Sequence, residues 1–177
     1  ASNDVLHAQI GRGRAGEIKK GYSKHLERSL VSWQAAQDLG YQLKLNTVVC
    51  NYNKLDDMSE LVAQLRPHRW KVFQALPIKG ENDDVWDELE ITSEEFRAWV
   101  ARHRLLEPVV ESNELMTGSY CMLDGKLRFY NNVGGAFKHS APIPEVGMDR
   151  AWSEIASMFN DDVFEDRGGV WSWEVSK

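Results

Sequence analysis

The order of secondary-structure patterns in the first half of the chain constrains its fold most. A helical pattern at 18–39 precedes a strand pattern at 41–50, and a second helical pattern starting at Asp56 or Asp57 and running through 65 precedes a strand pattern at 69–76. Consecutive strands that are joined by a helix are parallel, because the helix carries the chain back to the same edge of the sheet. The sequence therefore predicts an α/β fold.

The two predicted strands carry polar residues where a parallel sheet is normally apolar. Lys44 and Asn46 alternate along the first strand, and Arg69, Lys71 and Gln74 are placed along the second. In a barrel such period-two positions project inward together. Several buried cations are costly unless an anion is present, which predicts a pocket for a polyanion such as a triphosphate. Solvated charges on an edge strand are the alternative.

Two glycine–arginine segments are further candidates for anion binding. Residues 10–16 read Ile-Gly-Arg-Gly-Arg-Ala-Gly, and Arg167 is followed by two glycines. Backbone N–H groups and a guanidinium can wrap a phosphate or carboxylate. The first segment lacks the Gly-Lys-Ser/Thr ending of a P-loop. A flexible basic loop and a C-terminal turn remain the alternatives.

The second half predicts shorter elements and no repeat or linker, so residues 1–177 are expected to form a single domain. Asp124-Gly125 is a strong turn signal and predicts a β-hairpin. The predicted elements are an acidic loop at 80–95, a helix at 93–104, hairpin strands at 119–123 and 126–130, a Gly/Pro-rich loop at 131–144, a helix at 148–158 and a last strand at 170–173.

Charge and cysteine content exclude several classes of protein. The net charge of −6 argues against a general nucleic-acid or anionic-membrane binder, although a local basic cluster can still bind a small anion. Cys50 and Cys121 form no metal-binding pair and are expected to be buried free thiols in strands, in a reducing, cytoplasmic compartment. No apolar run approaches the ~20 residues of a membrane span, and there is no signal peptide. The start at Ala1, without a Met, indicates missing upstream residues.

Nine short motifs, taken in order, resemble the viperin family of radical S-adenosylmethionine (SAM) enzymes over nearly the whole chain. The most specific part is Arg-Trp-Lys-Val-Phe-Gln at 69–74 followed by Gly-Glu-Asn at 80–82. The others are Ile-Gly-Arg-Gly at 10–13, Lys-Leu-Asn at 44–46, Asp-Met at 57–58, Glu-Ser-Asn at 111–113, Ser-Tyr at 119–120, Arg-Phe at 128–129 and Arg-Gly-Gly at 167–169.

This resemblance implies the C-terminal half of a partial (β/α)6 radical SAM barrel. Residues 1–78 would supply barrel βα units, and 79–177 would form an extension with a β-hairpin and a closing tail that completes the substrate pocket. The family binds a [4Fe–4S] cluster and SAM, and cleaves SAM to a 5′-deoxyadenosyl radical. It converts a ribonucleoside triphosphate, typically CTP, to a 3′-deoxy-3′,4′-didehydro analogue with antiviral action; UTP and GTP are the alternative substrates considered for this chain.

The resemblance also implies residue roles. Tyr120 matches an active-site tyrosine that could shuttle a proton or quench a radical, and Arg12 matches an arginine near SAM. Lys138 aligns with a phosphate-binding lysine after a one-residue shift. The positions matching nucleotide or triphosphate ligands are Lys44, Asn46, Arg69, Lys71, Lys138 and Arg167.

The chain departs from the family in one respect. It has neither the Cys-x3-Cys-x2-Cys motif that holds the cluster nor the Gly-Gly-Glu motif that holds SAM, both of which lie upstream of the position matching Ala1. We therefore expect the metal ligands on a missing N-terminal half, or on a second chain, and no SAM cleavage by this chain alone. A non-catalytic triphosphate-binding or protein-interaction domain, and a radical SAM enzyme with another substrate, are the alternatives. An upstream helix could attach the protein to membranes.

Overall fold

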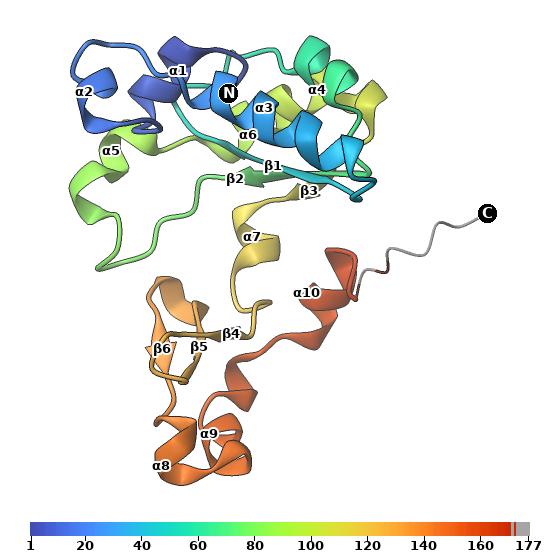
Figure 1. The fold of residues 1–177 in the computed structure, drawn as a ribbon. Coiled ribbons are helices and arrows are strands. Elements are labelled where there is room, and N and C mark those ends of the chain that lie inside the picture. The colour runs from blue at the N-terminus through green and yellow to red at the C-terminus, as the bar shows by residue number, and fades with distance from the viewer. Residues whose placement is uncertain (171, 173–177) are drawn as a thin grey trace. The chain divides into compact units, whose positions relative to one another are not determined.

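The computed structural model describes residues 1–170 and 172, and the chain divides into two compact units. Unit 1 comprises Ala1–Ala75 and Asp87–Val110, and unit 2 comprises Leu76–Trp86 and Glu111–Lys177 (Figure 1). The predicted last strand at 170–173 falls largely outside the described residues.

Unit 1 is built on a small sheet of order β1-β2-β3. Strands β1 (Lys44–Val49) and β2 (Arg69–Gln74) pair in parallel, and helix α4 (Ser59–Leu65) connects them, which confirms the predicted βα units. Figure 1 shows α3 and α4 on one side of these strands. Strand β3 (Val109–Glu111) was not predicted, because three residues are too few to show a period-two pattern.

The helices of unit 1 follow the apolar patterns with shorter bounds. The predicted helix 18–39 is broken, because Gly21 has a positive φ of 75° and the regular helix starts only at His25. The remaining helical segments are α1 (Asp4–Gln9), α2 (Ala15–Ile18), α3 (His25–Asp38), α5 (Trp86–Leu89, whose first residue belongs to unit 2), α6 (Ser93–Arg102) and the 3-10 turn Arg104–Leu106.

Trp99 of α6 is the centre of the unit 1 core. Its ring centroid lies 5.9 Å from that of Trp70 on β2 and 3.9 Å from that of His103. His103 is buried and fixed at both nitrogens: Nε2 accepts from the Met58 backbone at 2.9 Å, and Nδ1 lies 2.8 Å from the Trp99 carbonyl oxygen. Thr47 of β1 accepts a hydrogen bond from Trp70 Nε1 at 3.0 Å. The face of the sheet that carries Thr47 and Trp70 is therefore the one packed against the core.

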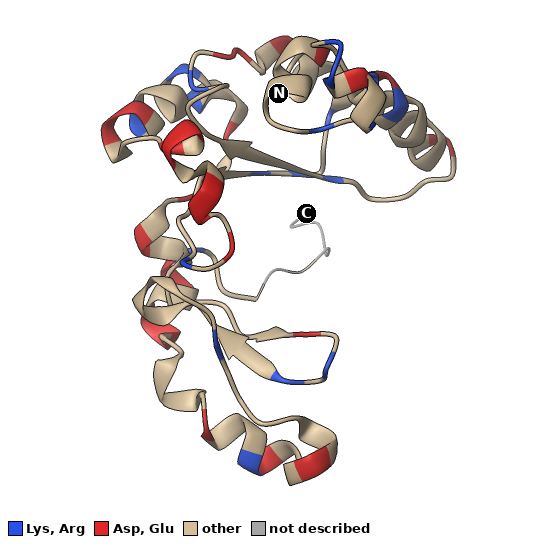
Figure 2. Cartoon of the chain, turned by 90° about the vertical axis from the view of Figure 1, so that its left-hand side faces the viewer, with Lys and Arg blue, Asp and Glu red and all other residues tan. Residues whose placement is uncertain are grey.

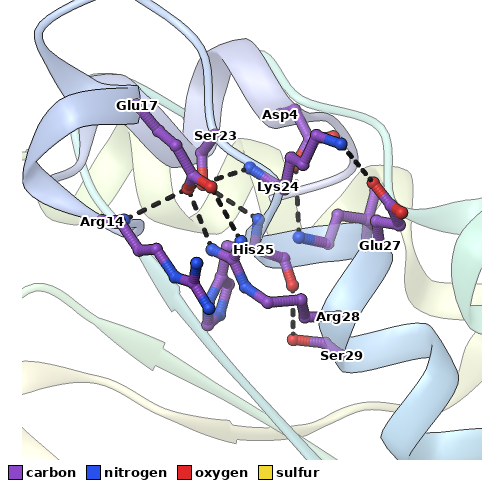
Figure 3. A network of polar contacts seen from close by, with 10 residues as sticks. Asp4, Arg14, Glu17, Ser23, Lys24, His25, Glu27, Arg28 and Ser29 are labelled. Atoms are coloured by element: carbon purple, nitrogen blue, oxygen red, sulfur yellow. Dashed lines mark hydrogen bonds and ion pairs between the residues drawn. The ribbon is translucent and has the colours of Figure 1, made fainter.

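Glu17 organises the glycine–arginine segment at residues 10–16. Its carboxylate accepts two hydrogen bonds from the Arg28 guanidinium, at 2.8 and 2.9 Å, and further bonds from the backbone N–H groups of Arg14 and Lys24 (Figure 3). A Cβ on Gly13 would lie 2.6 Å from Ser23 Oγ. The loop is therefore shaped by an internal carboxylate, and the Arg28 hydrogen bonds in particular lower the pKa of Glu17 to about 2.

This depressed pKa predicts an acid-sensitive contribution to stability. The contribution is fully present above the ordinary value of 4.5 and is lost as the pH falls toward about 2, because the unfolded state binds the proton first. Urea unfolding of Glu17→Gln and the parent between pH 6 and pH 3 should show the difference between them shrinking as the pH falls. Glu27→Gln is the control, since the ion pair of Glu27 with Lys24 is long, at 3.8 Å, and exposed to solvent. A constant difference for Glu17→Gln would contradict the assignment.

Unit 2 contains an antiparallel sheet of order β4-β5-β6. Strands β4 (Met122–Leu123) and β5 (Phe129–Asn131) form the predicted hairpin, although with shorter strands. Asp124 closes the turn by accepting from the backbone of Lys126 and Arg128, each at 2.9 Å, and chiefly the Arg128 backbone bond lowers its pKa to about 2. Strand β6 (Lys138–His139) pairs with β5, so the predicted loop 131–144 is interrupted by a strand.

The other elements of unit 2 are short. They are helices α7 (Asn113–Met116), α8 (Ile143–Val146), α9 (Met148–Ser153) and α10 (Asp161–Asp166), with 3-10 turns at Asp83–Val85, Val133–Gly135 and Ala156–Met158. Of the prediction that both cysteines are buried in strands, only the burial of Cys50 is confirmed: Cys50 follows the end of β1, and Cys121 is exposed and lies just before β4. Within the described part of the chain, no helix has the length and apolar character needed to cross a membrane.

Candidate functional site

The register of β1 and β2 brings four predicted ligand residues together on one face of the unit 1 sheet. Lys44 lies opposite Arg69, and Asn46 lies opposite Lys71. These positions alternate with Thr47 and the other residues of the packed face, so they point to the opposite side of the sheet. Figure 2 shows Lys and Arg in blue along these strands. We refer to Lys44, Asn46, Arg69 and Lys71 as the strand cluster.

The strand cluster grades from solvent to interior. Lys44 and Asn46 are exposed, Arg69 is half-buried, and Lys71 is only 7% exposed. The Lys71 Nζ lies 5.3 Å from the centre of the Phe73 ring, two residues further along β2. A cation over an aromatic face is attracted by the ring, so Phe73 helps to hold the Lys71 ammonium in place. Such a residue at the end of a row of cations is typical of a ligand site.

Gln74 does not belong to this face, so its suggested place among the inward positions is wrong. It differs in parity from Arg69 and Lys71 and is buried, and its Nε2 donates to the Ile91 carbonyl at 3.1 Å. Within β2, Gln74 alternates in step with Trp70, which lies on the packed face of the sheet.

A pocket of about 560 Å³ lies within unit 1 beside the strand cluster. It brings Arg12, the predicted SAM residue, together with Asn46. Its other walls are partly apolar and aromatic, and they include His7, His25, Val48 and Phe73. Its size lies within the usual range for small-molecule sites, about 300–1,000 Å³. A wall that combines apolar side chains with Arg12, Asn46 and two histidines suits a polar organic ligand.

Two histidines of this pocket were missed by sequence reasoning. The ring centroids of His7 and His25 lie 4.9 Å apart, although the residues come from different helices. Burial, reinforced by nearby positive charge, lowers the pKa of His7 to about 4, so its ring is neutral at physiological pH. A single histidine in a short helix carries no spacing signal, and only the fold brings the two together.

In unit 2, one carboxylate connects the predicted catalytic tyrosine with a predicted phosphate ligand. The Tyr120 hydroxyl donates to Glu111 Oε2, and Arg167 Nη1 lies 3.4 Å from Glu111 Oε1. Arg167 Nη2 donates to the Ser119 carbonyl at 3.0 Å, and its guanidinium carbon lies 3.8 Å above the Tyr120 ring. Glu111 was recognised only as part of a motif, with no role.

Two buried asparagines hold the segment that carries Tyr120. Asn131 Nδ2 donates to the Tyr120 carbonyl at 2.8 Å and to the Gly118 carbonyl at 3.2 Å. Asn132 accepts from the Gly118 N–H at 2.9 Å and donates to the Met116 carbonyl at 3.2 Å. The β5 end and the residue after it thereby fix the loop that follows α7. Lys138 is exposed on β6, opposite Asn131.

The residues present do not fit an iron–sulfur cluster. Three thiolates are needed, and the two cysteines of the chain lie in different units. Among residues 1–170 and 172, no group of three or more His, Cys, Asp or Glu side chains is arranged to hold a metal ion. Any cluster must therefore be held by residues outside this sequence.

Comparison with known proteins finds relatives along nearly the whole chain. No family model matches the chain, but individual proteins do. An S-adenosylmethionine-dependent nucleotide dehydratase of Lacinutrix mariniflava is 40% identical over 170 residues, which is 96% of this chain and 34% of that protein. The viperin resemblance is confirmed. A dehydratase of the same name from Flammeovirga pacifica is 42% identical over 80% of this chain and 48% of its own length.

The similarity extends to proteins that carry the name RSAD2. The S-adenosylmethionine-dependent nucleotide dehydratase RSAD2 of Siniperca chuatsi is 35% identical over 97% of this chain and 48% of its own length. The chain thus spans about a third to a half of the length of these relatives. The matched proteins are enzymes by name, and their names state a dependence on SAM and a nucleotide substrate.

Proposed function

We propose that this chain is the nucleotide-binding part of a viperin-type, SAM-dependent nucleotide dehydratase with the C-terminal half of a partial (β/α)6 barrel. The observation that supports this most strongly is the strand cluster, because three cations and an amide share one face in the register that β1 and β2 impose. The names of the relatives agree with a nucleotide substrate. The chemistry itself requires the part that binds the iron–sulfur cluster, and this sequence does not contain the cysteine motif of that part.

The strand cluster is proposed to bind a ribonucleoside triphosphate, with CTP as the preferred substrate and UTP or GTP as alternatives. Lysine and arginine side chains neutralise phosphate oxygens, and a guanidinium can engage two of them at once. Asn46 carries both donors and an acceptor, which suits the uncharged part of a nucleotide. Arg167 and Lys138 of unit 2 are further proposed triphosphate ligands.

SAM is proposed to lie in the 560 Å³ pocket of unit 1, with Arg12 beside it. A guanidinium suits the carboxylate of its methionine part. When bound, SAM supplies the radical that the family uses. The residues of this chain bind and orient the two substrates, and Tyr120 is the proposed catalytic residue. The product would be the 3′-deoxy-3′,4′-didehydro nucleotide, with an antiviral role. A cytoplasmic location is proposed, since both cysteines are free thiols.

The test is turnover by anaerobically reconstituted protein that includes the cluster-binding part, with SAM and each of CTP, UTP, GTP and ATP in separate reactions. We expect 5′-deoxyadenosine and a dehydrated nucleotide with at least one triphosphate, and most with CTP. SAM cleavage without change in any nucleotide would indicate another substrate. Triphosphate binding without SAM cleavage would indicate a non-catalytic binding domain.

A further inference from the structure

Glu111 connects the two unit 2 residues that carry proposed functions. It ends β3, its side chain is 0% exposed, and its two carboxylate oxygens face different partners. Oε2 accepts from the Tyr120 hydroxyl, and Oε1 pairs with Arg167. A carboxylate removed from water is stable only when charged or hydrogen-bonded groups replace its hydration. These two contacts supply such groups.

Each partner is in turn held so that it cannot easily turn away. The Arg167 side chain is 9% exposed, and its guanidinium lies between the Tyr120 ring at 3.8 Å and the Phe164 ring at 5.1 Å. Its Nη2 bond to the Ser119 carbonyl fixes it to the residue before Tyr120. The Glu111 carboxylate, the Tyr120 phenol and the Arg167 guanidinium therefore form one network of contacts, in which Glu111 sets the direction of the Tyr120 O–H bond.

We propose that Glu111 is a positioning residue, which fixes the direction of the Tyr120 hydroxyl and the place of the Arg167 guanidinium for the dehydratase reaction. This rests on the proposed function of Tyr120. With its proton directed at Oε2, the phenol oxygen presents lone pairs to any other neighbour. A proton that a bound substrate gives to the Tyr120 oxygen can then be matched by passage of the phenol proton to Glu111 Oε2, and the reverse transfers restore both groups; this arrangement favours a proton shuttle over direct hydrogen donation to a radical.

The test combines a spectroscopic and a kinetic measurement. The protein is labelled with 3-fluorotyrosine, and the signal of Tyr120 among the five tyrosines is assigned with Tyr120→Phe. We expect Glu111→Gln to move the Tyr120 signal and leave the other four in place, because the amide keeps the shape and loses the charge. Glu145→Gln, an exposed position on α8, is the matched control and should move none.

In the complete enzyme, Glu111→Gln should lower kcat roughly 10- to 100-fold, the scale of a misplaced reacting group, with KM for CTP changed less than about threefold. Glu111→Asp, which keeps the charge, should recover part of kcat. An unmoved Tyr120 signal, an unchanged kcat, or equal movement of all five signals would overturn the proposal, the last by showing a purely structural role. If the parent turns over no triphosphate, the proposed function fails, while the fluorine spectrum still decides whether Glu111 orients Tyr120.

Discussion

Replacing Lys71 by methionine is expected to raise the CTP concentration for half-maximal binding on the order of 10- to 100-fold, the worth of one charged hydrogen bond in a shielded site. The same change should alter the melting temperature only modestly, because Lys71 is 7% exposed and methionine fills a similar volume there. Calorimetric titration with CTP and thermal unfolding of the same samples measure both effects.

Lys20→Met is the matched control for this result. Lys20 is an exposed lysine of unit 1 that follows α2, outside the strand cluster. Its replacement should leave CTP affinity within about twofold, since an exposed charge is largely screened by salt. Equal losses for Lys20→Met and Lys71→Met would mean that overall charge governs binding. Unchanged affinity in Lys71→Met would remove Lys71 from the site.

Replacing Trp99 by alanine is expected to lower the free energy of unfolding by about 3–5 kcal/mol, as for other large aromatic side chains in cores. Trp99 is 0% exposed, and its ring contacts both Trp70 of β2 and His103. The resulting cavity would loosen the face of the sheet opposite the strand cluster. Urea unfolding followed by circular dichroism measures the change.

Leu105→Ala is the control for the core, because Leu105 is 88% exposed in the turn after α6. It should change the free energy of unfolding by no more than about 0.5 kcal/mol. A loss below about 1 kcal/mol for Trp99→Ala would contradict the packing described for unit 1.

The parallel βα units could be predicted because their signals are local and long enough. A six-residue strand shows its period-two alternation, and the same alternation identified Lys44, Asn46, Arg69 and Lys71 as one face. Gln74 was assigned to the wrong face, because a shift of one residue along a strand moves a side chain to the other side of the sheet. Strands β3 and β6, with three and two residues, are set by tertiary pairing and leave no local pattern.

The rest of the candidate site depends on long-range contacts. His7 and His25 meet in the pocket because α1 and α3 are adjacent, and Glu111 meets Arg167 across 56 positions of sequence. Residues 87–110 return to unit 1, where α6 packs against β2, although they follow a segment of unit 2. Local sequence patterns do not encode such returns, so roles for these residues become visible only in the folded chain.

The central claim is that the strand cluster binds the triphosphate part of a nucleotide. The most direct measurement is a titration of the protein with CTP and with cytidine, followed by backbone amide NMR. We expect saturable shifts for CTP that are centred on Lys44, Asn46, Arg69 and Lys71, with much weaker binding of cytidine, because the phosphates supply the charge. Absence of saturable binding, or equal affinity for CTP and cytidine, would contradict it.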